Sequence, residues 1–184
     1  MNRTVCLLTT AALVAGCGAG GGPPSAAPRP ARAASALVGS PPPLRSLHRQ
    51  SARLLGGGAD AFRARLAGLR GHPVIVNKWA SWCGPCRSEF PFLQRLSVEL
   101  GRRVAFIGVD SQDSDADAAR FLRRYPVRYP SYIDPDQKVA KVFGATLAFP
   151  STAFYDARGK LVFVHQGAYA TEAKLRDDIR RYAG

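Results

Sequence analysis

The sequence predicts an α/β fold in which a mainly parallel sheet is covered by helices on both faces. Three observations support this prediction. Short β-branched runs alternate with segments of helical spacing from residue 59 onward, two of these runs read as buried strands, and the chain closes with two strands around an "ARG" turn. Strands that alternate with helices imply parallel neighbours, whereas the closing hairpin adds antiparallel edge strands.

The first predicted elements are a helix, a strand and a second helix. Residues 59–69 place apolar side chains at helical spacing, and Gly71 and Pro73 end this helix. The β-branched run "VIVNKWA", 74–80, is a candidate buried strand. Residues 84–100 place leucines on one helical face and predict the next helix.

The remaining elements continue the alternation to the end of the chain. They are a buried strand at 103–110, a helix at 115–125, a weak strand at 131–134, a short helix ending at Phe143, and two strands within 151–167. Thr171 can cap a final helix that reaches about Tyr182, because a threonine hydroxyl accepts an N–H of the first turn.

The N-terminus has the pattern of an export signal. Arg3 precedes a mostly apolar stretch, 5–15, that is too short to span a bilayer. The stretch ends in "LVAGC", whose small residues before Cys17 resemble the bacterial lipobox. We therefore expect residues 1–16 to be a signal peptide and Cys17 to be lipidated, with an ordinary signal peptide cut nearby as the alternative.

We expect the rest of the chain to be a linker and one domain. Residues 17–52 are rich in proline, glycine, alanine and serine and lack aromatic residues. Such a composition buries too little apolar surface to fold, so this segment is expected to be a disordered linker. Residues 53–184 are long enough to bury a core and are expected to form the folded domain.

The charge pattern argues against some functions. The chain has 26 basic and 13 acidic residues, a formal net charge of +13. No basic run is interleaved with aromatic residues, so nucleic acid is not an expected partner. The excess charge favours a solvated basic surface, with attraction to anionic headgroups as the alternative.

Two cysteines, Cys83 and Cys86, lie between a predicted strand and a predicted helix in "WCGPC". Gly84 permits a tight turn, and Pro85 suits the first helical turn, where its missing N–H is not needed. Cys83 then lies at the helix N-terminus, where free N–H groups and the helix dipole stabilise a thiolate. Cys86, one turn into the helix, can resolve a mixed disulfide, and Trp82 can shield the pair and contact a partner.

The motif WCGPC at a strand-to-helix junction resembles thioredoxin. Pro91 lies where thioredoxin-like helices have a kink. The stretch "FPST", 149–152, resembles the one whose proline is cis and faces the active site. The resemblance therefore implies that Cys83 and Cys86 are a redox pair and that Pro150 forms a substrate groove beside them.

Two further residues resemble the TlpA/ResA/DsbE branch of extracytoplasmic, membrane-tethered thiol–disulfide proteins. They are Asn77, six residues before the first cysteine, and Glu89, three residues after the second. The resemblance covers about residues 53–184 and implies a thioredoxin-like fold with an inserted helix and strand between 111 and 143. A partly buried Glu89 would have a raised pKa and could exchange protons with the resolving cysteine, whereas a solvated helix carboxylate is the alternative. Asn77 would offer hydrogen bonds below the active site.

The sequence departs from that family at two places. Lys78 follows Asn77 where an apolar residue is usual, and a charge in a central strand needs a partner or a route to solvent. Phe149, before the proline, is larger than expected and either narrows the substrate groove or fills the core.

Other chemistries are less well supported. A structural disulfide would not need the WCGPC geometry, and two thiolates make only half a zinc site, with no second CxxC following. No metal or other cofactor is therefore expected. A copper carrier would need a histidine close to the cysteines, but His48, His72 and His165 are scattered along the chain. A peroxiredoxin needs a hydroxyl three residues before its reactive cysteine, where this chain has Ala80.

We therefore expect a thiol–disulfide oxidoreductase, a disulfide reductase on the outer face of the bacterial cytoplasmic membrane. The resemblance implies protein disulfides as substrates, apocytochrome c among them, and a membrane-bound redox partner that recharges the domain. We expect it to act as a monomer. The same site run backwards would oxidise secreted proteins, and a non-enzymatic binding module is a further alternative.

Overall fold

The computed structural model describes Met1 and residues 28–183 of the 184-residue chain. Most of the expected signal peptide, 1–16, and the expected lipid site, Cys17, lie outside the described residues. Among the described residues, none of the helices combines the length and apolarity needed to cross a bilayer.

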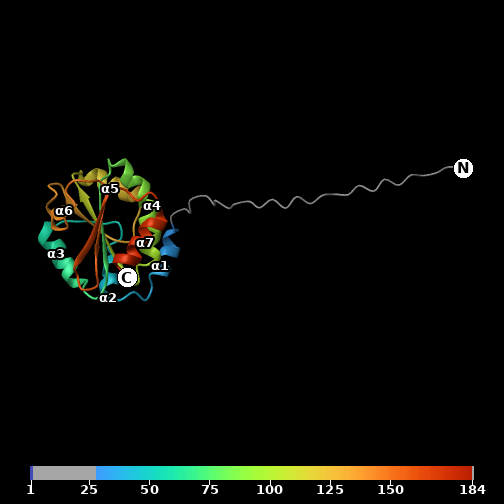
Figure 1. Ribbon diagram of the computed structural model, residues 1–184, viewed down its shortest axis with the longest axis horizontal. Helices are drawn as coiled ribbons and strands as arrows, with labels where there is room; N and C mark the ends of the chain where they lie inside the picture. Colours follow the sequence, from blue (N-terminus) through green and yellow to red (C-terminus); the bar gives the residue numbers. More distant parts are fainter. Residues whose placement is uncertain (2–27, 184) are drawn as a thin grey trace.

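A six-stranded sheet forms the centre of the domain, in the order β1-β4-β3-β2-β5-β6 (Figure 1). Its strands are β1 (Leu54–Leu55), β2 (Val74–Trp79), β3 (Ala105–Ser111), β4 (Ser131–Asp134), β5 (Ser151–Tyr155) and β6 (Leu161–Gln166). Strands β1 to β4 run parallel to one another, whereas β5 pairs antiparallel with β2 and β6 pairs antiparallel with β5. Every residue of β2 and β3 is buried, as expected for central strands covered on both faces.

Helices cover both faces of this sheet (Figure 1). They are α1 (Pro30–Ala36), α2 (Pro42–His48), α3 (Gly58–Gly68), α4 (Gly84–Glu99), α5 (Asp115–Arg124), α6 (Lys138–Val142) and α7 (Glu172–Tyr182). The core is accordingly divided into two clusters. One joins Trp79 and Phe90 to residues of α5 and α7, and the other joins Phe62 and Phe143 to residues of α2 and β3.

The predicted mixed α/β fold is confirmed, and each predicted strand and helix from residue 59 onward is present. The expected insertion between 111 and 143 contains α5, β4 and α6. Strand β4 pairs with β3 and thereby extends the parallel side of the sheet.

The prediction of a disordered linker over 17–52 is wrong for residues 28–52. Helices α1 and α2 lie in this segment, and Ala33, Leu37, Leu44 and Leu47 are buried. Leu44 and Leu47 lie one helical turn apart, so both enter the core cluster that contains Phe62. The composition of residues 17–52 suggested disorder because it contains few large apolar residues. A few leucines are nevertheless enough to order a short, proline-initiated helix when they pack on the apolar surface of the domain.

The two-residue strand β1 was also not predicted. Its backbone pairs with Ser131 and Tyr132 at the start of β4. Two residues carry no periodicity that a sequence pattern could reveal.

Candidate active site

The two cysteines of WCGPC lie at the start of α4, just beyond the end of β2. They are joined by a disulfide and are almost completely buried, with exposed fractions of 3% for Cys83 and 0% for Cys86. Cys83 is the N-cap of α4, and its Sγ accepts the backbone N–H of Cys86 at 3.1 Å. The predicted position of Pro85 in the first turn and that of Pro91 inside the helix are confirmed.

The expectation that Gly84 is there to permit a tight turn is wrong. Its φ is not in the left-handed region, and a Cβ built there would meet no atom within 4 Å. The turn into α4 therefore does not require glycine, although a larger side chain there would stand at the exposed mouth of the site.

The electrostatics at Cys83 favour a thiolate once the disulfide is reduced. The first turn of α4 contains no acidic residue, and its N-terminal backbone N–H groups point toward the N-cap. These groups and the positive end of the helix dipole stabilise negative charge on Cys83. The residue therefore has the environment of an attacking cysteine.

An exposed tryptophan and a half-buried phenylalanine border the disulfide. Trp82 is 56% exposed, its ring centroid lies 4.9 Å from that of Phe149, and its Nε1–H donates to the Gln112 carbonyl at 2.8 Å. The Phe149–Pro150 peptide is cis, as the resemblance implied. Within the described part of the chain, no hydrogen bond engages the backbone N–H or C=O of Phe149. The structure thus brings Trp82, Phe149 and the segment before Cys83 together.

Glu89 lies beneath this surface and is only 1% exposed. Its Oε1 accepts Asn77 Nδ2–H at 2.7 Å, and its Oε2 accepts the backbone N–H of Tyr169 at 3.1 Å. Burial raises the pKa of Glu89 to about 7, although both hydrogen bonds lower it. The alternative of a solvated helix carboxylate is therefore wrong, because the side chain is buried. With this pKa the carboxyl can take up or release a proton near neutral pH.

Three residues around Glu89 were not predicted to belong to the site: Thr152, Tyr129 and Tyr169. Asn77 also donates to Thr152 Oγ1 at 3.4 Å, while Asn77 Oδ1 and the hydroxyl of Tyr129 are buried without a partner among the described residues. Tyr129 is close enough to Glu89 for the carboxylate to raise the pKa of the phenol, in addition to the larger effect of burial. No sequence signal could have identified Tyr169, since it contributes a backbone N–H from 80 residues away.

Lys78 has the partner that the sequence did not reveal. Its side chain is fully buried, and Nζ donates to Gln137 Oε1 at 2.7 Å and to the Ala145 carbonyl at 2.8 Å. The ammonium also lies 3.7 Å from the centroid of the Phe149 ring. Burial lowers the pKa of Lys78 to about 8, with the charge of Asp134 opposing the shift. Lys78 therefore ties the segment before Pro150 to the central strand.

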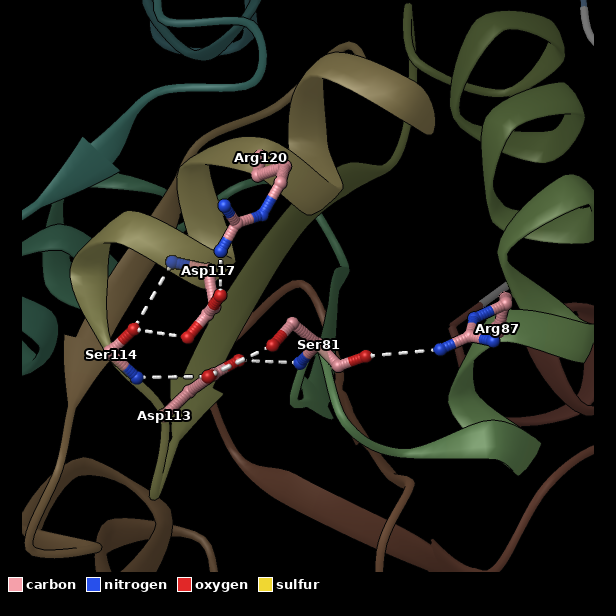
Figure 2. A network of polar contacts seen from close by, with 6 residues as sticks. All are labelled: Ser81, Arg87, Asp113, Ser114, Asp117 and Arg120. Carbon is pink, nitrogen blue, oxygen red and sulfur yellow. Dashed lines mark hydrogen bonds and ion pairs between the residues drawn. The ribbon is translucent and has the colours of Figure 1, made fainter.

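An acidic residue just after β3 holds the loop before the cysteines. Asp113 accepts the backbone N–H of Ser81, and its Oδ1 accepts the Ser81 hydroxyl at 2.9 Å (Figure 2). Nearby Asp110 is buried, and burial followed by the charge of Asp113 raises its pKa to about 8. These contacts fix Ser81, two residues before Cys83.

The histidines lie apart from one another in the fold. His48 ends α2, His72 precedes β2, and His165 lies in β6 with its ring centroid 4.0 Å from that of Tyr169. Among residue 1 and residues 28–183, no group of three or more His, Cys, Asp or Glu side chains is arranged to hold a metal ion.

Known proteins share this arrangement. The model of the Redoxin family matches residues 52–179. The thiol-disulfide oxidoreductase ResA of Bacillus subtilis (strain 168) is 29% identical over 116 residues, which cover 62% of this chain and 64% of that protein. The thiol:disulfide interchange protein DsbE of Xylella fastidiosa (strain 9a5c) is 33% identical over 138 residues, which cover 73% of this chain and 64% of that protein.

Solved structures agree with these relatives. A DsbE-type thiol:disulfide interchange protein of Chlorobium tepidum has a TM-score of 0.59 and 26% identity, covering 65% of this chain and 85% of that one. MTB DsbF has a TM-score of 0.57 and 29% identity, covering 62% of this chain and 83% of that one. The relatives are named for thiol–disulfide exchange, and the cysteine pair of this chain lies at the start of α4 in the matching fold. The chain thus belongs to the Redoxin family, as a TlpA/ResA/DsbE-like protein with the thioredoxin fold of thiol–disulfide oxidoreductases.

Proposed function

We propose that this domain reduces disulfides of extracytoplasmic proteins by thiol–disulfide exchange. The observation that carries the proposal is the position of Cys83, whose Sγ caps α4 while the buried carboxyl of Glu89 lies one turn after Cys86. An attacking thiolate and a proton-exchanging group near the resolving thiol are the two parts that the reaction needs.

The reaction begins with both cysteines reduced. The Cys83 thiolate attacks one sulfur of a substrate disulfide, a Cys83–substrate S–S bond forms, and the other substrate sulfur leaves as a thiolate. Cys86 then attacks Cys83 Sγ, which closes the intramolecular disulfide and releases the second substrate thiol. The substrate gains two electrons and two protons, and a membrane-bound redox partner must return two electrons to the domain.

Glu89 supplies the proton exchange for the second step. Cys86 must lose its proton to attack, and a carboxylate with a pKa of about 7 can accept it. Asn77 and the Tyr169 N–H hold the carboxylate in place from two other elements of the fold. When the domain is recharged, the same carboxyl returns the proton.

Substrate binding is assigned to the surface formed by exposed Trp82 and half-buried Phe149, next to the buried Pro150. The backbone groups of Phe149 are available for pairing with an extended substrate segment, and Trp82 offers an apolar face beside the cysteines. Backbone pairing binds many sequences with modest affinity, which suits a protein that must release its product.

Membrane attachment through lipidated Cys17 is part of the same proposal. The pattern "LVAGC" supports it, and apocytochrome c is the substrate implied by resemblance to the TlpA/ResA/DsbE branch. Replacing Cys17 with alanine should release the protein from membranes or block its processing. A Cys17→Ala protein that stays tethered and is processed normally would remove the lipid anchor from the proposal.

The redox potential of the Cys83–Cys86 pair tests the direction of transfer. Equilibration with glutathione should give a value near that of thioredoxin, about −270 mV, and the protein should be reduced in the cell. A potential near −120 mV with an oxidised protein in the cell would instead make it an oxidant of secreted proteins.

Single-cysteine variants test the two roles. Cys86→Ser should accumulate a mixed disulfide through Cys83, and Cys83→Ser should form none. Alkylation of the reduced wild type with limiting reagent should label Cys83 first. Preferential labelling of Cys86 would reverse the assignment.

A further inference from the structure

A cavity of about 320 Å³ lies beside the redox pair, between the start of α4 and the side of α5. Ser81 and Arg87 line it from the cysteine segment, and Arg120 and Arg124 line it from α5. Figure 2 shows Arg87, from α4, to the right of Ser81 and Arg120, from α5, above it. In the sequence, Ser81 and Arg87 flank the segment that contains both cysteines. A group held in this cavity therefore lies next to the site of exchange.

The cavity carries an excess of positive charge. Asp117, the one carboxylate among its lining residues, is already paired with Arg120. Arg87 donates only to a backbone carbonyl, at 3.4 Å, and the Nε–H of Arg124 donates to the Tyr125 hydroxyl at 3.3 Å. Within the part of the chain that the structure describes, neither Arg87 nor Arg124 has an acidic partner. Two guanidinium groups are therefore available to an anion.

The position of Arg87 is unfavourable for its own helix. It lies at the N-terminal end of α4, where the helix dipole is positive and no acidic side chain stands in the first turn. A cation in this position is repelled by the dipole. An anion bound between Arg87 and Arg124 would offset that repulsion.

The lining of the cavity suits a short carboxylate side chain. Phe121, which is 6% exposed, and Tyr125 supply an apolar wall beside the guanidinium groups. Guanidinium groups bind carboxylates with two parallel hydrogen bonds, and the methylene groups of aspartate or glutamate can rest on the aromatic wall. The volume is small for an acyl chain, which separates this cavity from a lipid-binding groove.

The cavity and the surface assigned to the substrate meet at consecutive residues, since Ser81 lines the cavity and Trp82 belongs to that surface. Trp82 contacts Phe149 on one side and the Gln112 carbonyl on the other, and the neighbouring Asp113 holds Ser81 at the edge of the cavity. A polypeptide that crosses Trp82 to reach Cys83 therefore passes beside the arginines.

We propose that this cavity binds an acidic side chain of the protein substrate, close in sequence to the substrate cysteine. The inference rests on the proposed exchange reaction and adds a preference for substrates with aspartate or glutamate near the disulfide. Complementary charge raises the rate of productive encounter more than it raises final affinity. The expected signature is a faster, salt-sensitive formation of the mixed disulfide.

The test uses three peptides that differ only in the residues flanking one cysteine: glutamate, glutamine or lysine. The cysteine of each peptide carries a 2-thiopyridyl disulfide. The Cys83 thiolate attacks the peptide sulfur, the thiopyridyl sulfur leaves with the electron pair and takes up a proton as thiopyridone, and Cys86 then displaces the peptide thiol. The release of thiopyridone from each peptide gives a second-order rate constant for the reduced full-length protein.

The wild type should react about three- to tenfold faster with the glutamate peptide than with the glutamine peptide, a range expected for two partly exposed ion pairs. The lysine peptide should be slowest, and added salt should compress the differences. In Arg87→Gln/Arg124→Gln the ratio of the glutamate to the glutamine rate should fall to about one. The matched control is Arg123→Gln on the same helix, which removes a charge next to Arg124 without touching the cavity and should keep the wild-type ratio.

Three results would overturn the inference. They are equal glutamate and glutamine rates in the wild type, a ratio that survives in the double variant, and an equal loss of the ratio in Arg123→Gln. Binding of the wild type, but not of the double variant, to phosphatidylglycerol vesicles with no peptide preference would assign the cavity to a lipid headgroup instead. Failure of the proposed function is distinguishable, because the reduced protein would then release thiopyridone from none of the three peptides.

Discussion

Replacing Glu89 with glutamine tests whether the carboxyl beneath the cysteines titrates near neutral pH. Burial raises its pKa from the ordinary 4.5 to about 7. Between these two values the folded protein binds a proton that the unfolded chain has lost, so the free energy of unfolding falls as the pH rises. Each pKa unit corresponds to about 1.4 kcal/mol, and the shift therefore corresponds to about 3 kcal/mol. This contribution is fully present below pH 4.5 and is lost as the pH rises through 7.

The assay is urea unfolding of the oxidised protein from pH 4 to 8.5, because the cysteines do not titrate in the disulfide form. Glu89→Gln lacks the ionisation, so its free energy of unfolding should gain about 3 kcal/mol relative to the wild type across this range. Glutamine can accept only one of the two N–H groups that contact Glu89, which should cost about 1 kcal/mol at every pH.

Glu99→Gln on the same helix is the matched control. A hydrogen bond from Arg176 lowers the pKa of Glu99, so the small stabilisation by its carboxylate is present at neutral pH and lost as the pH falls. The loss begins only as the pH falls below 4.5, so the difference between Glu99→Gln and the wild type should stay nearly constant over the range in which Glu89 titrates. Parallel profiles for Glu89→Gln and the wild type would refute the raised pKa, and with it the role of Glu89 in proton exchange.

The remaining predictions concern the polar contacts of β2 and the helices that were expected to be a linker. Asn77→Ala removes a hydrogen bond to the carboxylate and should raise the pKa of Glu89 above its wild-type value; a carboxyl ¹³C titration that gives an unchanged or lower midpoint would contradict this. Between pH 8 and 10.5 the unfolded lysine binds a proton that the folded one has lost, so the free energy of unfolding of the wild type should rise by about 3 kcal/mol with pH. Lys78→Met should abolish this rise. Equal slopes of the two proteins in urea unfolding would show that Lys78 is not desolvated. Leu44→Ala should lower the free energy of unfolding by about 2–5 kcal/mol, whereas Val38→Ala, at a side chain 73% exposed, should leave it unchanged; equal effects would mean that α2 does not contribute to the core.

The parts of the fold that the sequence could predict are those with a periodic pattern. The run 74–80 has the β-branched residues of a buried strand, and WCGPC combines a proline of the first helical turn with a cysteine at the cap. These signals are local, so neighbouring residues are enough to recognise them.

The parts that could not be predicted depend on contacts between distant segments. Lys78 has its partners 59 and 67 residues further along the chain, and the Tyr169 N–H that holds Glu89 is contributed by backbone alone. Helix α2 is ordered by the domain against which it packs, so a composition that predicts disorder in isolation does not predict it beside an apolar surface.

The docking of α1 limits the working range of the enzyme under the lipid-anchor proposal. Only residues 18–27 separate Cys17 from the first described residue of the folded body, Pro28. A fully extended chain spans at most about 3.6 Å per residue, so this segment can span at most about 36 Å. A linker that ran to residue 52 could span more than three times that distance. The folded domain then begins within about 36 Å of the membrane surface. Its partners must therefore present their disulfides close to the membrane.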